Sequence, residues 1–319
     1  MTSVNAGVLI GLDWGTTSLR AHLLDSDGQV LDRRSSAEGI LADQKGGFAE
    51  TFQRVTGGWF DVLPSVPVVA SGMITSRNGW VETPYVSVPA GIDELASSLV
   101  PFDVSPSCTI HFVCGMDQDP PGGTPDIMRG EETQIVGCLS PGCSSLAKGA
   151  AGLFVMPGTH SKWISVCEGN LDRFDTYMTG EVFAVLKEHS ILGRLMETGG
   201  GPMTGGFERG VSARLDSEAS LLRHIFSSRT LALFDRLEPG EIADYLSGLL
   251  IGEEVRSAMR DFDGKDDGDS SVTIVGSGAL TDRYRVALAL AGITAAPAPE
   301  DAAARGHFSI ARQAGLIDG

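Results

Sequence analysis

Two short segments of the chain combine glycine with hydroxyl side chains in the same order. The first is Gly11-Leu12-Asp13-Trp14-Gly15-Thr16-Thr17-Ser18 and the second is Pro157-Gly158-Thr159-His160-Ser161, so Gly-Thr-x-Ser occurs twice. Glycine lets the backbone approach a ligand closely, and the hydroxyl and amide groups beside it can bind a phosphate. One segment alone is equally typical of a hairpin turn, but the repetition favours the phosphate interpretation. The predicted phosphate contacts are Gly15, Thr16, Thr17, Gly158 and Thr159.

The elements that position these segments are also repeated. The apolar run at residues 8–10 and the alternating segment at 19–24 predict that the first loop lies at the tip of a β-hairpin. Each copy continues through a second turn and a further strand, and then reaches Glu38-Gly39 or Gly180-Glu181. Two such β-meanders predict two related domains whose hairpin tips face one another across a cleft. Asp13, at the first tip, offers a hard oxygen ligand for a metal ion.

The length of 319 residues is enough for two domains that each bury a core. Small and polar residues between Cys138 and Gly149 indicate a hinge, so we expect the domains at residues 1–140 and 141–319. A segment rich in glycine and proline, residues 115–125, is expected to lack regular structure.

The net charge of −17 argues against a general surface for nucleic acid or anionic membranes, since both need clustered Lys and Arg. Five cysteines without Cys-x-x-Cys spacing disfavour a disulfide framework and a zinc site. No signal peptide or apolar run of membrane-spanning length is visible, so a cytoplasmic protein is expected. The sequence shows no coiled-coil pattern, and a homodimer is left open.

A pair of carboxylates, Glu131 and Glu132, opens a predicted amphipathic helix. The helix dipole stabilises acidic residues in a first turn, and this is one sufficient reason for the pair. We favour the alternative that one carboxylate points into the cleft as a base, with Arg129 just before it as an anion partner.

Two further segments follow buried strands. The loop after residues 68–73 concentrates polar and aromatic side chains, where α/β folds place ligand contacts, although a solvated turn with one aromatic anchor would look similar. Its candidate contacts are Arg77, Asn78, Trp80, Glu82 and Tyr85. The strand at 272–275 runs into Gly276-Ser277-Gly278 before a predicted helix, whose free N–H groups can hold a nucleotide.

These motifs resemble those of the sugar kinase, actin and heat-shock ATPase superfamily and, more closely, the 2-dehydro-3-deoxygalactonokinase family. The resemblance covers nearly the whole chain and implies two ribonuclease-H-like domains, as in actin-like ATPases, facing a nucleotide cleft. It rests on Asp13-Trp14-Gly15-Thr16-Thr17, Ser71-Gly72-Met73-Ile74, Arg77-Asn78-Gly79-Trp80, Met128-Arg129-Gly130-Glu131-Glu132-Thr133-Gln134, Pro157-Gly158-Thr159-His160-Ser161-Lys162-Trp163 and Met178-Thr179-Gly180-Glu181.

The resemblance implies phosphate transfer from ATP to the 6-hydroxyl of 2-dehydro-3-deoxy-D-galactonate. Asp13 would then hold Mg²⁺, and Gly276, Ser277 and Gly278 would seat the adenosine. Arg77 and Arg129 would bind the substrate carboxylate, because a guanidinium can grip it with two hydrogen bonds. Trp80 and Glu82 are the remaining predicted substrate contacts.

Sugar kinases of this architecture commonly carry Gly-Asp where this chain has Gly130-Glu131, so Glu131 is the favoured base. The departure from that pattern keeps Glu132 and Asp126 as alternatives. Three other functions stay open: a kinase for a related acid such as 2-dehydro-3-deoxygluconate, a phosphatase or ATPase with the same fold, and a non-catalytic nucleotide-dependent regulator.

Overall fold

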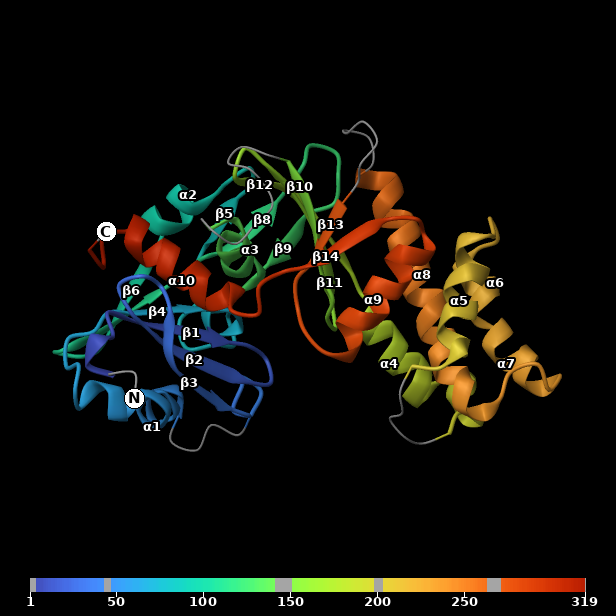
Figure 1. The fold of residues 1–319 in the computed structure, drawn as a ribbon, viewed down its shortest axis with the longest axis horizontal. Helices are drawn as coiled ribbons and strands as arrows, with labels where there is room; N and C mark the ends of the chain where they lie inside the picture. The colour runs from blue at the N-terminus through green and yellow to red at the C-terminus, as the bar shows by residue number, and fades with distance from the viewer. Residues whose placement is uncertain (1–3, 43–46, 141–150, 198–202, 263–270, 319) are drawn as a thin grey trace. The chain divides into compact units, whose positions relative to one another are not determined.

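A computed structural model describes residues 4–42, 47–140, 151–197, 203–262 and 271–318 (Figure 1). The chain divides into two compact units. Unit 1 comprises Met1–Ala151, Val166–Arg173 and Pro299–Gly319, and unit 2 comprises Gly152–Ser165 and Phe174–Ala298. The expected division into independently folding domains at residues 1–140 and 141–319 stays a prediction. Most of the expected hinge between Cys138 and Gly149 lies outside the described residues. None of the helices in the described ranges combines the length and apolar character needed to cross a membrane.

Unit 1 is built on a six-stranded sheet of order β3-β2-β1-β4-β7-β6. Its elements are β1 (Leu9–Trp14), β2 (Leu19–Leu24), β3 (Val30–Ser36), α1 (Gly47–Phe60), β4 (Val68–Ser71), β5 (Tyr85–Ser87), α2 (Ile92–Ser97), β6 (Val100–Ser105), β7 (Cys108–Phe112), β8 (Gly115–Gln118), β9 (Asp126–Met128), α3 (Glu131–Leu139) and α10 (Ala302–Gln313), with short 3₁₀ helices at Val4–Ala6 and Met73–Thr75. Strands β1 and β2 form the predicted hairpin, in which Trp14 pairs with Leu19. Strand β4 runs parallel to β1 and to β7.

Unit 2 repeats this plan in a five-stranded sheet of order β12-β11-β10-β13-β14. Its elements are β10 (Gly152–Met156), β11 (Ser161–Cys167), β12 (Asn170–Tyr177), α4 (Thr179–His189), α5 (Gly205–Leu215), α6 (Leu221–Ile225), α7 (Ser227–Leu233), α8 (Ile242–Phe262), β13 (Ser271–Ile274), α9 (Ala279–Leu290) and β14 (Thr294–Pro297), with 3₁₀ helices at Ile191–Leu195 and Pro239–Glu241. The end of β11 and the start of β12, within Val166–Arg173, are counted with unit 1. In each sheet a three-stranded meander is followed by two strands parallel to its first member, and the first sheet adds the antiparallel strand β6 at its edge. The predicted internal repeat is therefore present in the sheet order.

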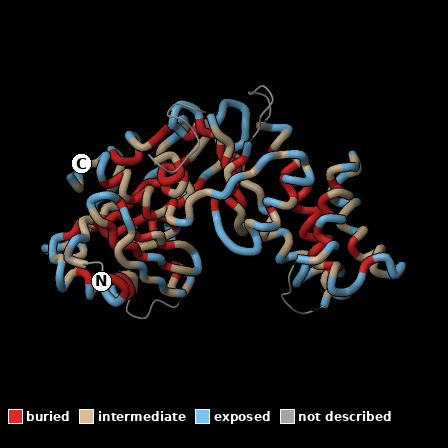
Figure 2. The backbone as a smooth tube through the Cα atoms, in the orientation of Figure 1, coloured by how far each residue is buried: buried red, intermediate tan, exposed pale blue. Residues whose placement is uncertain are grey.

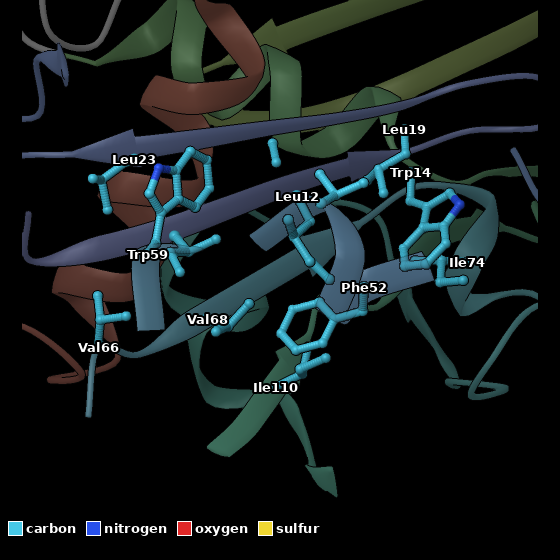
Figure 3. Packing of buried hydrophobic residues seen from close by; sticks show 14 of the residues in the cluster. Leu12, Trp14, Leu19, Leu23, Phe52, Trp59, Val66, Val68, Ile74 and Ile110 are labelled. Atoms are coloured by element: carbon cyan, nitrogen blue, oxygen red, sulfur yellow. The ribbon is translucent and has the colours of Figure 1, made fainter. Parts of the chain in front are cut away.

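The two faces of the first sheet are used differently because successive side chains of a strand point to opposite sides. Leu12 of β1 packs with Phe52 of α1 and with Val68 and Ile110 of the neighbouring strands (Figure 3). Gly11 lies on the other face, where a Cβ would stand 2.8 Å from Nδ1 of His307 in α10. Helices α1 and α10 thus cover opposite faces, and the buried backbone follows the strands between them (Figure 2).

Helix α10 also packs closely on α3. A Cβ at Gly137 of α3 would overlap the carbonyl oxygen of Ala302, and a Cβ at Gly306 of α10 would overlap the carbonyl oxygen of Thr133. Glycine at both positions therefore lets the two backbones touch. This contact fixes α3, and with it the carboxylate pair at its start, against the end of the chain.

The segment expected to be irregular contains a strand, so that prediction is wrong for part of it. Residues Gly115–Gln118 form β8, which pairs in parallel with β5 and antiparallel with β9. A Cβ at Gly115 would lie 2.5 Å from the carbonyl oxygen of Met128. The glycine that suggested a loop is needed here for close approach of two strands.

Two buried histidines, His22 and His307, should make the stability of the fold sensitive to acid. Burial, aided by His22, lowers the pKa of His307 to about 3. Burial lowers the pKa of His22 to about 4, where Arg33 and Arg20 also disfavour the proton and Asp301 favours it. The unfolded chain, with imidazole pKa values of about 6.5, therefore binds protons that the folded chain does not. Stability present above about pH 6.5 is lost as the pH falls toward 4.

We expect the free energy of unfolding to fall by up to about 1.4 kcal/mol per pH unit for each imidazole in that window. Denaturant titrations at several pH values would measure this slope. His22→Gln should reduce the slope of unfolding free energy against pH by the contribution of one proton. His189→Gln should leave the slope unchanged, because His189 is exposed on α4. Equal slopes in wild type and His22→Gln would contradict the expectation.

Candidate active site

The first Gly-Thr loop lies between β1 and β2, as predicted, and a second segment braces it. The N–H of Gly15 donates to the carbonyl of Ser18 at 2.9 Å, which closes the turn. The N–H groups of Ile40 and Leu41 donate to the carbonyls of Gly15 and Thr16, each at 3.1 Å. Just before Ile40 the chain passes so close to the loop that a Cβ at Gly39 would overlap the backbone of Thr16. Thr16 and Thr17 remain exposed for a ligand.

The second loop is braced in the same way. The N–H of Glu181 donates to the carbonyl of Thr159 at 3.0 Å, and a Cβ at Gly180 would overlap the carbonyl oxygen of Gly158. The ring of His160 hydrogen-bonds the Glu181 carboxylate at 2.5 Å. The sequence repeat at Glu38-Gly39 and Gly180-Glu181 thus corresponds to the two braces. That the two loops hold one phosphate chain stays a prediction.

Three backbone segments of unit 1 bring the predicted carboxylates to the carboxyl ends of parallel strands. Asp13 of β1 is in register with Ser71 of β4. Gly72 follows Ser71, and a Cβ at Gly130 would lie 3.0 Å from the Gly72 Cα. Gly130 has a φ of 103°, which glycine adopts without strain, and α3 begins immediately after it with Glu131. This edge of a sheet is where α/β folds bind ligands.

Asp13 has the chemistry of a magnesium ligand. Its side chain is only 16% exposed, and its carboxylate lies 3.6 Å from the Arg20 guanidinium. Burial raises the pKa of Asp13 above its ordinary value, and Arg20 opposes that shift. A divalent cation would stabilise this desolvated carboxylate. The described residues contain no group of three or more His, Cys, Asp or Glu suited to a metal, and Mg²⁺ in kinases commonly needs only one or two carboxylates beside phosphates and water.

The two glutamates of α3 stand in different environments. Glu132 is 1% exposed and accepts hydrogen bonds from the Gly130 N–H at 2.7 Å and the Thr133 hydroxyl at 3.0 Å. Burial, together with the neighbouring Glu131, raises the pKa of Glu132 to about 8, so it holds a proton at neutral pH. Glu131 is half-buried and accepts from the Arg129 N–H at 3.0 Å. Glu131 is therefore the better placed of the two to accept a proton.

The guanidinium of Arg129 is held by its own unit. It donates to the hydroxyls of Thr75 at 3.0 Å and Thr83 at 2.6 Å and to the Thr83 carbonyl at 2.6 Å. Its planar face lies 4.1 Å from the centre of the Tyr85 ring. These contacts join the loop after β4 to the start of α3, which indicates that Arg129 positions the site.

The remaining predicted substrate contacts, Arg77, Trp80 and Glu82, differ in their exposure. Arg77 and Glu82 are exposed on the loop after β4. Trp80 packs among the rings of the core, 5.6 Å from Phe102 and 6.2 Å from Trp14, which favours an anchoring role for it. Asp126 opens β9 and caps the N–H of Ile127 at 2.7 Å.

Unit 2 contains a cavity of about 550 Å³, within the range of small-molecule sites. Its wall combines the second phosphate loop with apolar and polar side chains. The lining residues are Gly158, Thr179, Gly180, Phe183, Lys187, Glu197, Thr204, Pro239, Gly240, Ala243, Asp244, Ser247, Leu250, Ile251, Leu280, Arg283 and Tyr284. The cavity therefore joins the loop at Gly158 to one face of α8 and to α9.

Gly276-Ser277-Gly278 leads into α9 as predicted, with Gly278 at the helix N-terminus. Gly276 and Gly278 have φ values of 143° and 80°, so both need glycine. The cavity is lined not by this turn but by Leu280, Arg283 and Tyr284 of the following helix. The role of the turn in binding adenosine stays a prediction.

Asp244 and Arg283 form an ion pair in the cavity wall that the sequence did not indicate. Arg283 donates to Asp244 at 2.5 Å, and the N–H of Thr204 donates to the same carboxylate at 2.6 Å. Burial alone would raise the pKa of Asp244, but these hydrogen bonds outweigh it and the pKa is lowered. The three residues lie in separate elements, and only the tertiary structure brings them together.

Comparison with known proteins shows the family of the chain. A family model described as 2-keto-3-deoxy-galactonokinase matches residues 13–310. The chain is 34% identical over 316 residues to a Rhizobium meliloti protein assigned as a 2-dehydro-3-deoxygalactonokinase, covering 97% of this chain and 98% of that protein. It is 34% identical over 286 residues to the 2-dehydro-3-deoxygalactonokinase of Escherichia coli, covering 89% and 90%.

A solved structure shows the same fold. A crystal structure of a candidate 2-dehydro-3-deoxygalactonokinase from Sinorhizobium meliloti superposes with a TM-score of 0.82 at 33% identity, covering 95% of this chain and 98% of that chain. This likeness and the repeated sheet order confirm the predicted fold class, and the family match confirms the predicted kinase. The chain belongs to the 2-keto-3-deoxy-galactonokinase family.

Proposed function

We propose that the protein transfers the γ-phosphate of ATP to the 6-hydroxyl of 2-dehydro-3-deoxy-D-galactonate, a step of galactonate breakdown. Family membership and the names of the relatives support this acceptor. One observation supports nucleotide binding in unit 2: the wall of its cavity includes Gly158 of the second Gly-Thr loop. A nucleoside in that cavity would have its phosphates beside a loop suited to bind them.

Phosphoryl transfer depends on neutralised phosphate oxygens and an aligned acceptor more than on covalent help from the protein. We assign the acceptor proton to Glu131. As the acceptor oxygen bonds to the γ-phosphorus and the bond to the ADP oxygen breaks, the hydroxyl proton passes to the Glu131 carboxylate. Asp13 would hold Mg²⁺, which supplies positive charge for the phosphate oxygens. The exposed Thr16 and Thr17 would donate hydrogen bonds to phosphate.

Arg77→Ala should raise the KM for the sugar acid about 10- to 100-fold, the loss expected for a charge-assisted contact to a carboxylate. Arg77 is exposed, whereas Arg129 is engaged by Thr75 and Thr83. The KM for ATP should stay unchanged. Steady-state kinetics with each substrate varied in turn would measure both constants.

Arg312→Ala serves as the matched control, because Arg312 is an exposed arginine near the end of α10. It should leave both KM values within about twofold of wild type, as expected for a surface substitution. A wild-type KM for the sugar acid in Arg77→Ala would remove Arg77 from the proposed site.

A coupled ADP-release assay would test the proposal as a whole. The panel would contain 2-dehydro-3-deoxy-D-galactonate, 2-dehydro-3-deoxy-D-gluconate, neutral sugars and no acceptor. We expect ADP release that depends on the galactonate-derived acid, with a 6-phosphate product in the mass and phosphorus spectra. A preference for the gluconate-derived acid would reassign the acceptor. Rapid release without an acceptor would favour an ATPase.

We also propose that the protein is a homodimer. Apolar side chains exposed on consecutive segments of unit 2 support a partner surface there. They are Leu222, Phe226, Leu233 and Phe234. Light scattering of the purified protein would give the mass, and a monomer would count against the dimer.

A further inference from the structure

A buried carboxylate in unit 2 has no part in the proposed chemistry. Glu254 of α8 is 2% exposed and is not among the residues that line the cavity. It follows Ser247, Leu250 and Ile251 on one face of α8, since residues three and four apart share a helix face. Glu254 therefore stands one turn beyond the cavity, behind its wall.

The Glu254 carboxylate accepts hydrogen bonds from residues of β11, α4 and α9. Oε2 accepts from the Ser161 hydroxyl at 2.9 Å and the Tyr284 hydroxyl at 2.7 Å, and Oε1 accepts from the Trp163 indole N–H at 2.8 Å. The Thr179 hydroxyl also hydrogen-bonds this carboxylate. Ser161 and Tyr284 lie 3.0 Å apart, which closes the network.

Three of the four donors belong to segments that the proposed nucleotide site uses, and the fourth, Trp163, lies within β11. Ser161 ends the second phosphate loop, and Thr179 opens α4 next to the brace at Gly180. Tyr284 lies on α9, the helix that begins after Gly278. Thr179 and Tyr284 also line the cavity, as does Gly158. One carboxylate thus ties together the phosphate loop, its brace and α9, which also lines the cavity.

Burying the Glu254 carboxylate costs desolvation free energy, which indicates that the carboxylate has a specific role. Burial raises the pKa of Glu254, and hydrogen bonds from Thr179, Tyr284, Trp163 and Ser161 oppose that shift. A well-packed apolar side chain at such a place is often at least as stabilising as a buried charge, whereas a polar group fixes one arrangement of its partners.

We propose that Glu254 is a positioning residue that holds the second phosphate loop in register with α9 and so sets the affinity for nucleotide without touching it. The inference rests on the proposed function, because it assigns the nucleotide to this cavity. Glu254→Gln keeps the shape but removes one acceptor. The Trp163 indole can only donate, so the amide oxygen must face it and the amide NH₂ must face the hydroxyls of Ser161 and Tyr284.

Titration calorimetry with ADP would test the proposal on the full-length protein. Glu254→Gln should raise the Kd for ADP about tenfold, and Tyr284→Phe, which removes one donor, about three- to tenfold. The KM for ATP should rise with the Kd, while the KM for the sugar acid changes by less than about twofold. Unchanged ADP affinity in folded Glu254→Gln would overturn the proposal. If that variant does not fold, an unchanged Kd in Tyr284→Phe would overturn it.

Glu253→Gln is the matched control for a loss of stability. Glu253 is the adjacent carboxylate on α8, and it pairs with the buried Arg214 and with Arg256 at 3.5 Å. This variant should lower the Tm but leave the Kd for ADP within about twofold. Weakened binding in both variants in proportion to their Tm values would overturn the proposal. ADP titration needs no acceptor, so a failed kinase assignment would appear separately, as wild-type ADP binding without sugar-acid turnover.

Discussion

Replacing Glu131 by glutamine should lower kcat about 10³-fold, within the range that general bases contribute, while the Kd for ADP stays near wild type. The amide matches the carboxylate in shape and can still accept from the Arg129 N–H, but it cannot take the hydroxyl proton. Single-turnover kinetics together with ADP titration would separate the chemical step from binding. Near-normal turnover in Glu131→Gln would contradict the assignment.

Glu132→Gln is the matched comparison. Glu132 already carries a proton at neutral pH because burial, with Glu131 beside it, raises its pKa to about 8. The neutral amide should therefore cost less than about tenfold in kcat, since Thr133 can reverse its hydrogen bond. A collapse of turnover in Glu132→Gln with an active Glu131→Gln would transfer the base to Glu132.

Adding a single methyl group at either brace should lower kcat/KM about 10²-fold, a loss typical of small displacements in an active site. In Gly39→Ala the new Cβ would overlap the backbone of Thr16, and in Gly180→Ala it would overlap the carbonyl of Gly158. Backbone cannot move aside as a flexible side chain does, so the loop itself must shift. Steady-state kinetics and the Kd for ADP would measure the effect.

Gly57→Ala provides the control for the added methyl group. Gly57 lies inside α1, where a Cβ would meet its nearest neighbour, the Gln53 side chain, at 3.8 Å, an ordinary contact. This change should leave kcat/KM within about twofold and slightly stabilise the helix, because alanine has the higher helix propensity. Wild-type kinetics in Gly39→Ala and Gly180→Ala would show that neither brace controls its loop.

The repeated parts of the fold could be predicted from local sequence. A hairpin around Gly15 and a strand that runs into Gly278 each follow from short-range patterns of apolar and small residues. One Gly-Thr-x-Ser segment alone indicates only a common turn, but its second copy predicted a structural repeat. The matching strand orders of the two sheets confirm this repeat. The carboxylate pair of α3 was visible because the helix dipole and catalysis both favour acids at that position.

The remaining features depend on contacts between distant segments. Strand β8 was missed because glycine breaks most local strand patterns, whereas Gly115 permits close approach to Met128. Arg129 looked like a free anion ligand, and only the structure shows Thr75 and Thr83 engaging its guanidinium.

Glu254 gave no signal in the sequence for a similar reason. It follows another glutamate within α8, a pattern typical of a solvated helix face, yet Glu253 is partly exposed and Glu254 is buried. A helical period of 3.6 residues places adjacent residues about 100° apart, which can be the difference between solvent and core. Which face is covered depends on the packing of β11 and α9, and local pattern does not contain that information.

The return of α10 to unit 1 has a consequence for biosynthesis. The imidazole of His307 fills the space above Gly11, and its Nε2 lies 2.9 Å from the Ser71 hydroxyl, although 236 positions separate the two residues in the chain. During translation β1 and β4 therefore leave the ribosome long before this helix does. Until α10 is synthesised, the face of the first sheet at Gly11 lacks the helix that covers it. All segments of unit 2 are synthesised before α10. Unit 1 therefore cannot complete its core before α10 is made, although N-terminal domains usually fold first during synthesis.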